Sequence, residues 1–105
     1  MKAVAKIAPG PGFDLITAPI PKIGRREVLI KVKAAAICGT DVHIYEWDDW
    51  SRKRITPPLI FGHEFCGDIV EVGEGVNSVK LGQFVSVETH ITCGHCYYCR
   101  QGMGH

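Results

Sequence analysis

Three cysteines near the C-terminus have the spacing of metal ligands. Cys93, Cys96 and Cys99 follow one another at intervals of three residues in the stretch CGHCYYC. Clustered thiolates at this spacing are typical ligands of structural zinc, which normally takes four protein ligands. The fourth ligand is left open, with water, a neighbouring chain and His105 as the candidates. We therefore expect an incomplete zinc lobe over residues 90–105.

Two further stretches carry side chains suited to an active site. In AICGTDVH, Cys38 is followed by Thr40, and His43 lies three residues later, on the same side of an expected helix. In GHEF, His63 and Glu64 place an imidazole beside a carboxylate. Thiolate, imidazole and carboxylate are the usual protein ligands of zinc. Taken singly, each residue also has an ordinary interpretation, as a packed thiol or a surface histidine.

The elements expected to position these residues are mostly β-strands. Short apolar or alternating runs predict strands at 2–7, 13–18, 27–33, 65–72 and 83–88. In the strand at 27–33, Val28, Ile30 and Val32 are expected to face the core. The stretch 40–46 predicts a helix with Thr40 as its N-cap.

Two features between and within these elements are less specific. The polar, aromatic and proline-terminated stretch 47–58 predicts a loop lying over the cleft, in which Trp47 and Trp50 fit a core, an interface or a pocket wall equally well. Cys66 has no matching partner, so we expect it to be a packed thiol.

Composition narrows the class of protein. With 105 residues the chain predicts one domain, and its 46% apolar content suits a soluble protein with no run long enough to cross a bilayer. A formal net charge of +1 argues against a nucleic-acid partner, which normally requires a basic face. Five cysteines, three of them in one knuckle, without a signal peptide, predict metal binding in a reducing, cytoplasmic compartment.

The motifs together resemble those of one enzyme superfamily. The pattern G-H-E-x2-G-x5-G-x2-V, from Gly62 to Val76, is similar to the signature of the zinc-dependent medium-chain alcohol dehydrogenases, and the C-G-T-D-x-H stretch and the cysteine knuckle occur there at matching positions. The resemblance implies a mainly β (α+β) fold, a partly open, GroES-like β-barrel catalytic domain of which residues 1–105 form the N-terminal part. The Rossmann domain of such enzymes is absent, since no G-x-G-x-x-G fingerprint or other cofactor-binding motif is present.

The resemblance also implies roles for individual residues. Cys38, His63 and Glu64 would hold a catalytic zinc, and Cys93, Cys96 and Cys99 a structural zinc whose fourth cysteine belongs two residues beyond His105. Thr40 and His43 match a proton relay, and Asp41 matches a carboxylate that orients His63. His90 is a candidate pocket residue. The stretch AICGTDVHIYEWDDWS is similar to the branch that oxidises L-threonine at its β-hydroxyl with NAD, which implies a small-molecule substrate and a homotetrameric parent enzyme.

Alternatives to this interpretation remain. Another zinc-dependent polyol or secondary-alcohol dehydrogenase shares the same ligand types, and a stand-alone GroES-like zinc-binding module fits the β-rich pattern. A zinc-ribbon nucleic-acid binder fits less well, because ribbons pair two distant C-x2-C knuckles. We expect the chain alone to be inactive, with the lobe after about residue 90 mobile or metal-free and the β-domain before it folded.

Overall fold

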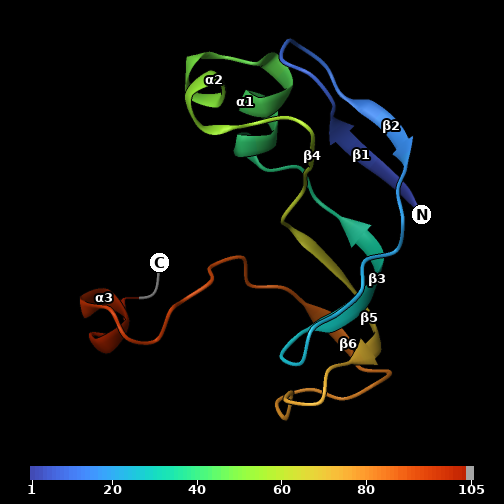
Figure 1. Ribbon diagram of the computed structural model, residues 1–105, viewed down its shortest axis with the longest axis vertical. Helices are drawn as coiled ribbons and strands as arrows, with labels where there is room; N and C mark the ends of the chain where they lie inside the picture. Colours follow the sequence, from blue (N-terminus) through green and yellow to red (C-terminus); the bar gives the residue numbers. More distant parts are fainter. Residues whose placement is uncertain (104–105) are drawn as a thin grey trace.

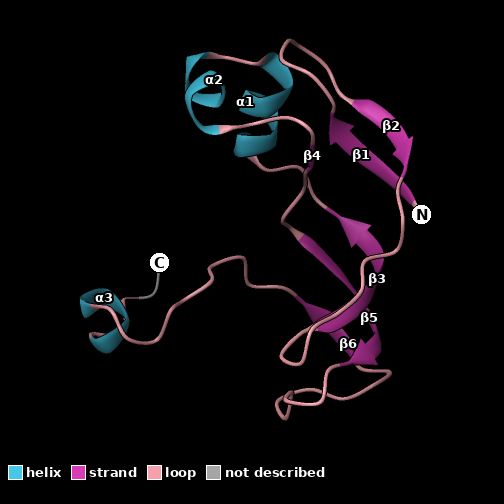
Figure 2. Ribbon diagram, in the orientation of Figure 1, coloured by secondary structure: helices cyan, strands magenta, loops and turns pink. Residues whose placement is uncertain are grey.

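Two three-stranded antiparallel sheets organise the computed structural model, which describes residues 1–103 (Figures 1 and 2). The first has the order β2-β1-β4 and the second the order β3-β5-β6. The strands of the first sheet are β1 (Lys2–Lys6), β2 (Asp14–Thr17) and β4 (Leu59–Ile60). Those of the second are β3 (Val28–Ala35), β5 (Phe65–Val72) and β6 (Phe84–Ser86). All five strands predicted from the sequence are therefore present, with shifted ends, and β4 is an addition.

The helices differ from the prediction in two respects. Helix α1 (Gly39–Glu46) is capped by Cys38 rather than by Thr40, because Cys38 keeps an extended backbone while Thr40 is already helical. Helix α2 (Asp49–Arg54) occupies the stretch 47–58 that was predicted to be a loop. The Asp48 carboxylate accepts a hydrogen bond from the Ser51 N–H at 2.9 Å and so starts this helix, and the basic residues of its last turn suit the negative end of the helix dipole. A third, short helix, α3 (Tyr97–Arg100), lies within the cysteine stretch.

Few buried apolar side chains cover the two sheets. Among the described residues, the buried apolar side chains are few and mostly small; they are Ala3, Ala5, Ala18, Ile44, Trp47 and Ile69. In β3, Val28 and Ile30 are half-buried, but Val32 is 52% exposed, so the prediction that it faces the core was wrong. Residues 31–35 of β3 are all exposed, so neither face of this part of the strand is covered.

A buried lysine joins the first sheet to the helices. Lys6 is 2% exposed, and its ammonium group donates to the carbonyl oxygens of Gly10 and of Gly12, the latter at 2.5 Å. The same group lies 5.3 Å from the centre of the Trp47 ring and 5.4 Å from that of Phe13. Burial lowers the pKa of Lys6 from its ordinary value. These contacts hold the turn between α1 and α2 against β1. Side-chain packing therefore helps to position the two helices, in addition to their covalent connections.

No helix among residues 1–103 is both long enough and apolar enough to cross a membrane.

Candidate active site

Cys38, His63 and Glu64 converge at the point where α1 begins and β5 begins. One potential metal-ligating atom from each residue lies within 4.8 Å of the others. Cys38 and His63 are half-buried and Glu64 is exposed, so the cluster opens to solvent on one side. A hydrogen bond from the Ala36 N–H to the Glu64 carbonyl, at 2.8 Å, ties the two segments together just before Cys38. The three residues that the sequence suggested as ligands are thus brought together by the pairing of β3 with β5.

Asp41 lies behind this cluster and contacts two of its members. Its side chain is buried at 2% exposure, and one carboxylate oxygen, Oδ2, accepts from the Cys38 N–H at 2.9 Å. The other, Oδ1, lies 3.8 Å from Nδ1 of His63 and has no hydrogen-bond partner. A buried carboxylate oxygen facing a histidine ring nitrogen is the arrangement by which proteins orient a metal-ligating imidazole. The donor set and this unsatisfied oxygen therefore fit a divalent metal such as zinc.

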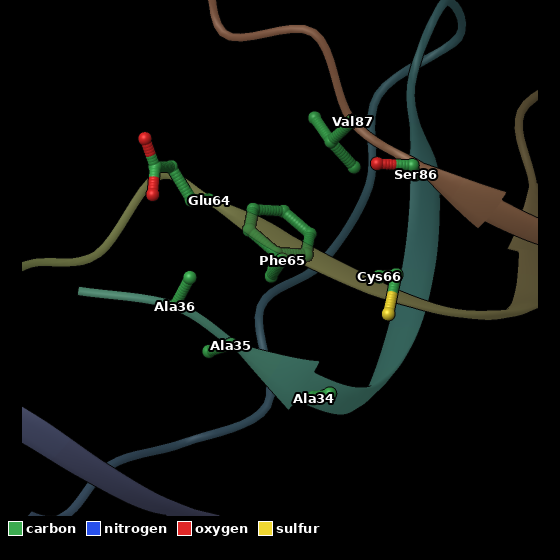
Figure 3. A pocket seen from close by; sticks show the side chains of 8 residues that line it. All are labelled: Ala34, Ala35, Ala36, Glu64, Phe65, Cys66, Ser86 and Val87. Atoms are coloured by element: carbon green, nitrogen blue, oxygen red, sulfur yellow. The ribbon is translucent and has the colours of Figure 1, made fainter. Parts of the chain in front are cut away.

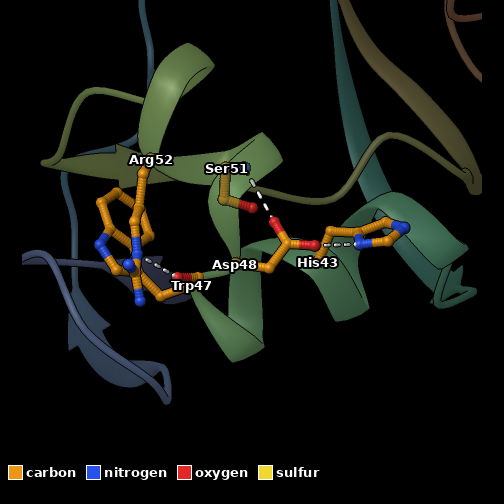
Figure 4. Close-up of polar contacts among 5 residues, drawn as sticks. All are labelled: His43, Trp47, Asp48, Ser51 and Arg52. Atoms are coloured by element: carbon orange, nitrogen blue, oxygen red, sulfur yellow. Dashed lines mark hydrogen bonds and ion pairs between the residues drawn. The ribbon is translucent and has the colours of Figure 1, made fainter.

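Thr40 and His43 lie on α1 beside the cluster. The Thr40 hydroxyl oxygen is 3.8 Å from Sγ of Cys38. The imidazole of His43 is about half exposed, and its Nδ1 lies 2.6 Å from Oδ2 of Asp48 (Figure 4). The backbone N–H of Ser51 and then His43 hold the pKa of the Asp48 carboxyl below its ordinary value. Asp48 was missed in the sequence, although an aspartate at the start of a helical stretch is a recognisable N-cap signal.

An open cleft of about 410 Å³ begins at Glu64 and follows the paired strands β3 and β5 (Figure 3). Glu64 stands at one end of it, and the Cys66 thiol and the Ser86 hydroxyl lie toward the other. Cys66 is half-buried and lies outside the metal-ligand groups found among the described residues. Cys66 lines the open cleft, so its role as a packed thiol stays a prediction.

The three C-terminal cysteines form a second cluster. Their Sγ atoms lie within 4.8 Å of one another, and the Cys93 and Cys99 sulfurs are 3.8 Å apart. All five cysteines are free thiols rather than disulfides. Backbone N–H groups of His95 and Cys96 lower the pKa of Cys93 to about 7, which favours the thiolate form that binds metal. Figure 1 shows this lobe standing apart from both sheets, at the end of the segment that leaves β6. His105, the suggested fourth ligand, lies outside the described residues.

A family model for the alcohol dehydrogenase GroES-like domain matches residues 24–105, which is most of the chain. The chain belongs to this family. Over all 105 residues, the GroES-like domain is 58% identical to L-threonine 3-dehydrogenase of Bacillus licheniformis and 55% identical to that of Pyrococcus horikoshii. It also matches the solved structure of an alcohol dehydrogenase from Escherichia coli CFT073 complexed with NADH, with a TM-score of 0.82 and 41% identity over 99% of the chain.

The GroES-like domain given by these residues is a part of the proteins that it matches. It spans 30% of the length of both threonine dehydrogenases and 29% of the Escherichia coli chain. Among residues 1–103 the structure has strands in two antiparallel sheets and no Rossmann fold, which confirms the predicted fold class. The predicted resemblance to zinc-dependent medium-chain dehydrogenases is confirmed as well.

The glycines of the family signature have a visible role in this GroES-like domain. A methyl group at Gly67 would lie 2.2 Å from the Lys31 carbonyl oxygen, and one at Gly73 would lie 2.4 Å from that of Gly24. Both positions therefore allow two backbone segments to approach closely. The glycine at position 67 of the signature therefore lets β5 pair closely with β3. This pairing holds His63 and Glu64 opposite Cys38.

His90 is the predicted site residue with the least support from its position in the domain. Its Nδ1 lies 2.5 Å from Oε1 of Glu88, and its backbone N–H donates to the same oxygen at 3.0 Å. These contacts lower the pKa of Glu88. They place His90 in the segment that leads from β6 to the cysteine lobe, and its role in a substrate pocket stays a prediction.

Proposed function

We propose that this GroES-like domain is the N-terminal catalytic portion of a zinc-dependent L-threonine 3-dehydrogenase, which oxidises L-threonine to 2-amino-3-ketobutyrate with NAD⁺. The observation that carries the proposal is the convergence of Cys38, His63 and Glu64 in front of the buried Asp41 carboxylate. A domain that only bound partners would not need such a donor set beside a threonine and a histidine. The identity to named threonine dehydrogenases supports the choice of substrate.

Cys38, His63 and Glu64 would hold the catalytic zinc. When bound there, zinc supplies a Lewis acid that makes a nearby hydroxyl group more acidic. Asp41 accepts from the backbone of Cys38 and faces His63, so it fixes the direction of both ligands at once. Because Glu64 is exposed at the mouth of the cleft, the open side of the cluster is the side from which a substrate would enter.

Thr40 and His43 would carry the hydroxyl proton away from the cluster. The Thr40 hydroxyl lies next to Cys38, and His43 is on the solvent side of α1. The proton would therefore pass from the Thr40 hydroxyl to His43 and then to bulk water. A bound nicotinamide would accept the hydride. Residues 1–105 contain no fingerprint for binding it. NADH in the Escherichia coli relative supports this choice of cofactor.

Further parts of the proposal follow from the same assignment. Cys93, Cys96 and Cys99 would hold a structural zinc, and His90 would line the pocket for the zwitterionic substrate. We place the complete enzyme in the cytoplasm as a homotetramer, with no nucleic-acid or membrane partner.

The test uses a complete dehydrogenase whose sequence begins with these 105 residues. We expect it to reduce NAD⁺ with L-threonine faster than with sorbitol or 2-butanol, followed as NADH absorbance. Cys38→Ser should lower both the zinc content and the rate, while Cys66→Ser, a matched change at a thiol outside both clusters, should leave the zinc content unchanged. A preference for sorbitol or 2-butanol would replace the substrate proposal with another alcohol dehydrogenase. Unchanged zinc content in Cys38→Ser would remove Cys38 from the metal site.

A further inference from the structure

Asp48 caps α2, and its carboxylate is also in contact with the imidazole of His43. We propose that Asp48 is a positioning residue for His43: its carboxylate holds the Nδ1–H of the ring, so that Nε2 is the nitrogen that takes up and releases the proton. The inference rests on the proposed function for the part His43 plays in the relay. The contact itself rests on geometry, with 2.6 Å between Nδ1 and Oδ2.

The turn between the two helices brings Asp48 back toward His43. Helix α1 ends at Trp47, whose N–H donates to the His43 carbonyl at 3.0 Å and whose backbone is left-handed, with φ 57° and ψ 44°. A left-handed conformation is costly for a residue with a bulky side chain. Burial of the Trp47 ring, with the Lys6 ammonium 5.3 Å from its centre, holds the residue in place. The reversal therefore places the next residue, Asp48, against the face of α1 that carries His43 (Figure 4).

Both oxygens of the Asp48 carboxylate are engaged. Oδ1 accepts from the Ser51 N–H at 2.9 Å and caps α2, and Oδ2 meets His43. Rotating the carboxylate to release the imidazole would uncap the helix, so the acceptor is held in a fixed direction. This is a different arrangement from an exposed ion pair between two free side chains, in which neither partner is held and little energy is gained.

The chemistry of the two groups decides which ring nitrogen is available. An ionised carboxylate can only accept a hydrogen bond, so Nδ1 of His43 must carry the hydrogen and Nε2 of the neutral ring is left with its lone pair. The centre of the Trp50 ring lies 5.9 Å from that of the His43 imidazole. The Arg54 guanidinium lies 5.2 Å from the centre of the same Trp50 ring. The proton released by the substrate hydroxyl passes by way of Thr40 to Nε2 and then to water. This step moves a proton and no electrons.

The test compares substitutions that separate the two functions of Asp48. Asp48→Ser keeps a side chain able to cap α2 but is too short to reach His43. Asp48→Asn keeps the cap through its one carbonyl oxygen but turns an amide N–H toward Nδ1 of His43, which must then accept rather than donate. Asp49→Ser is the matched control, since it removes the same charge one residue away, at a side chain that is 87% exposed and lies 3.6 Å from the Arg52 guanidinium.

The first measurement is the tautomer of His43, read by ¹⁵N NMR on the complete dehydrogenase labelled at histidine, with the signal assigned from His43→Gln. We expect the Nδ1–H form in wild type and Asp49→Ser, loss of that form in Asp48→Ser, and the Nε2–H form in Asp48→Asn. An Nε2–H ring in wild type, or an unchanged Nδ1–H ring in Asp48→Ser, would overturn the pairing. This readout does not depend on turnover, so it is decided even if threonine is not the substrate.

The second measurement is kcat/KM, with L-threonine or with whichever alcohol wild type oxidises best. A well-placed general base contributes roughly a hundredfold or more, so misdirecting it in Asp48→Ser should cost on the order of tenfold. Asp48→Asn should lose at least as much, because its amide N–H leaves the hydrogen on Nε2, and Asp49→Ser should equal wild type. Equal rates in Asp48→Ser and wild type would overturn the positioning role. If no alcohol is oxidised, the proposed function fails, the relay role fails with it, and the tautomer alone decides the pairing.

Discussion

At the scale of single residues, Asp41 Oδ1 is the atom that most requires an explanation. Buried carboxylate oxygens are normally hydrogen-bonded, and an unsatisfied one costs free energy. This oxygen lies 3.8 Å from Nδ1 of His63, a distance that a small rotation of the ring would reduce to a hydrogen bond. Binding of a metal on the other side of the imidazole supplies a reason for that rotation. The residue is therefore poised to satisfy its hydrogen bond when His63 acts as a ligand.

We predict that Asp41→Asn weakens zinc binding at the Cys38 cluster. Loss of the charged acceptor typically lowers metal affinity or activity by about 10- to 100-fold. The measurement is zinc retained during dialysis against a chelator of known affinity, made on the complete protein. Asp49→Asn, an exposed acid on α2, is the control and should retain wild-type affinity. Equal affinity for Asp41→Asn and wild type would mean that Asp41 serves only to cap α1 through the Cys38 N–H.

At the scale of elements, the pairing of β3 with β5 and the turn from α1 to α2 together build the site. The first brings His63 and Glu64 to Cys38, and the second brings Asp48 to His43. Each depends on one residue whose surroundings or backbone conformation restrict which side chains can replace it. Gly67 lies directly against the Lys31 backbone, and Trp47 holds a left-handed conformation. Changes at these positions should alter the site without touching a ligand.

We predict that Gly67→Ala destabilises the domain and weakens its zinc binding. The added methyl group would meet the Lys31 carbonyl oxygen at 2.2 Å, so the paired strands must separate. Forced overpacking of this kind typically costs about 1–3 kcal/mol. Gly39→Ala is a matched control, because nothing lies within 4 Å of a methyl group there. Urea unfolding should show a lower midpoint for Gly67→Ala only; equal midpoints for both variants would show that the strands can absorb the methyl group.

We predict that the charge of Asp48 stabilises α2 at neutral pH and not in acid. Its pKa is held below the ordinary 3.8, so the folded state binds this proton less readily than the unfolded state. The contribution is therefore complete above the unfolded pKa and is lost as the pH falls through the folded value. The difference in urea midpoint between wild type and Asp48→Asn should be larger at pH 7 than at pH 2.5. A difference that is independent of pH would mean that the charge plays no part.

At the scale of the whole molecule, residues 1–103 form an open arrangement with large apolar side chains in contact with solvent. Ile37 is 82% exposed, Phe84 63% and Ile91 99%. The chain spans 30% of the length of the threonine dehydrogenases that it matches. Catalysis requires metal, alcohol and nicotinamide at contact distance, and the motif for the nicotinamide is absent from this chain.

We predict that the 105-residue chain alone does not oxidise L-threonine and does not hold zinc firmly at Cys93, Cys96 and Cys99. With three thiolates and no fixed fourth ligand, a structural site loses much of its binding free energy. A thiol reagent should therefore modify these three cysteines quickly in the isolated chain with zinc present, and slowly in the complete protein. Cys66→Ser should not change the count of fast thiols. Three protected thiols in the isolated chain, or measurable turnover, would contradict this prediction.

The types of the ligand residues and the family could be read from the sequence alone. Alternating and apolar runs located the five main strands, because side-chain periodicity in a strand is local. The ligand motifs could be read for the same reason: Cys38, His63 and Glu64 each lie in a short stretch with recognisable residues and spacing. Asp48 as an N-cap was also readable locally, but the aromatic and proline content of 47–58 favoured a loop over the short helix that follows it.

Which of these residues come into contact depends on the tertiary fold. Cys38 is 25 residues away from His63, and their proximity depends on the register of β3 against β5, which is set by backbone contact at Gly67. The exposure of Val32 follows from the lack of cover over this part of β3, and the pairing of His43 with Asp48 follows from the left-handed turn at Trp47. Long-range register and chain reversal depend on packing between segments distant in sequence. Local patterns carry no direct information about such packing.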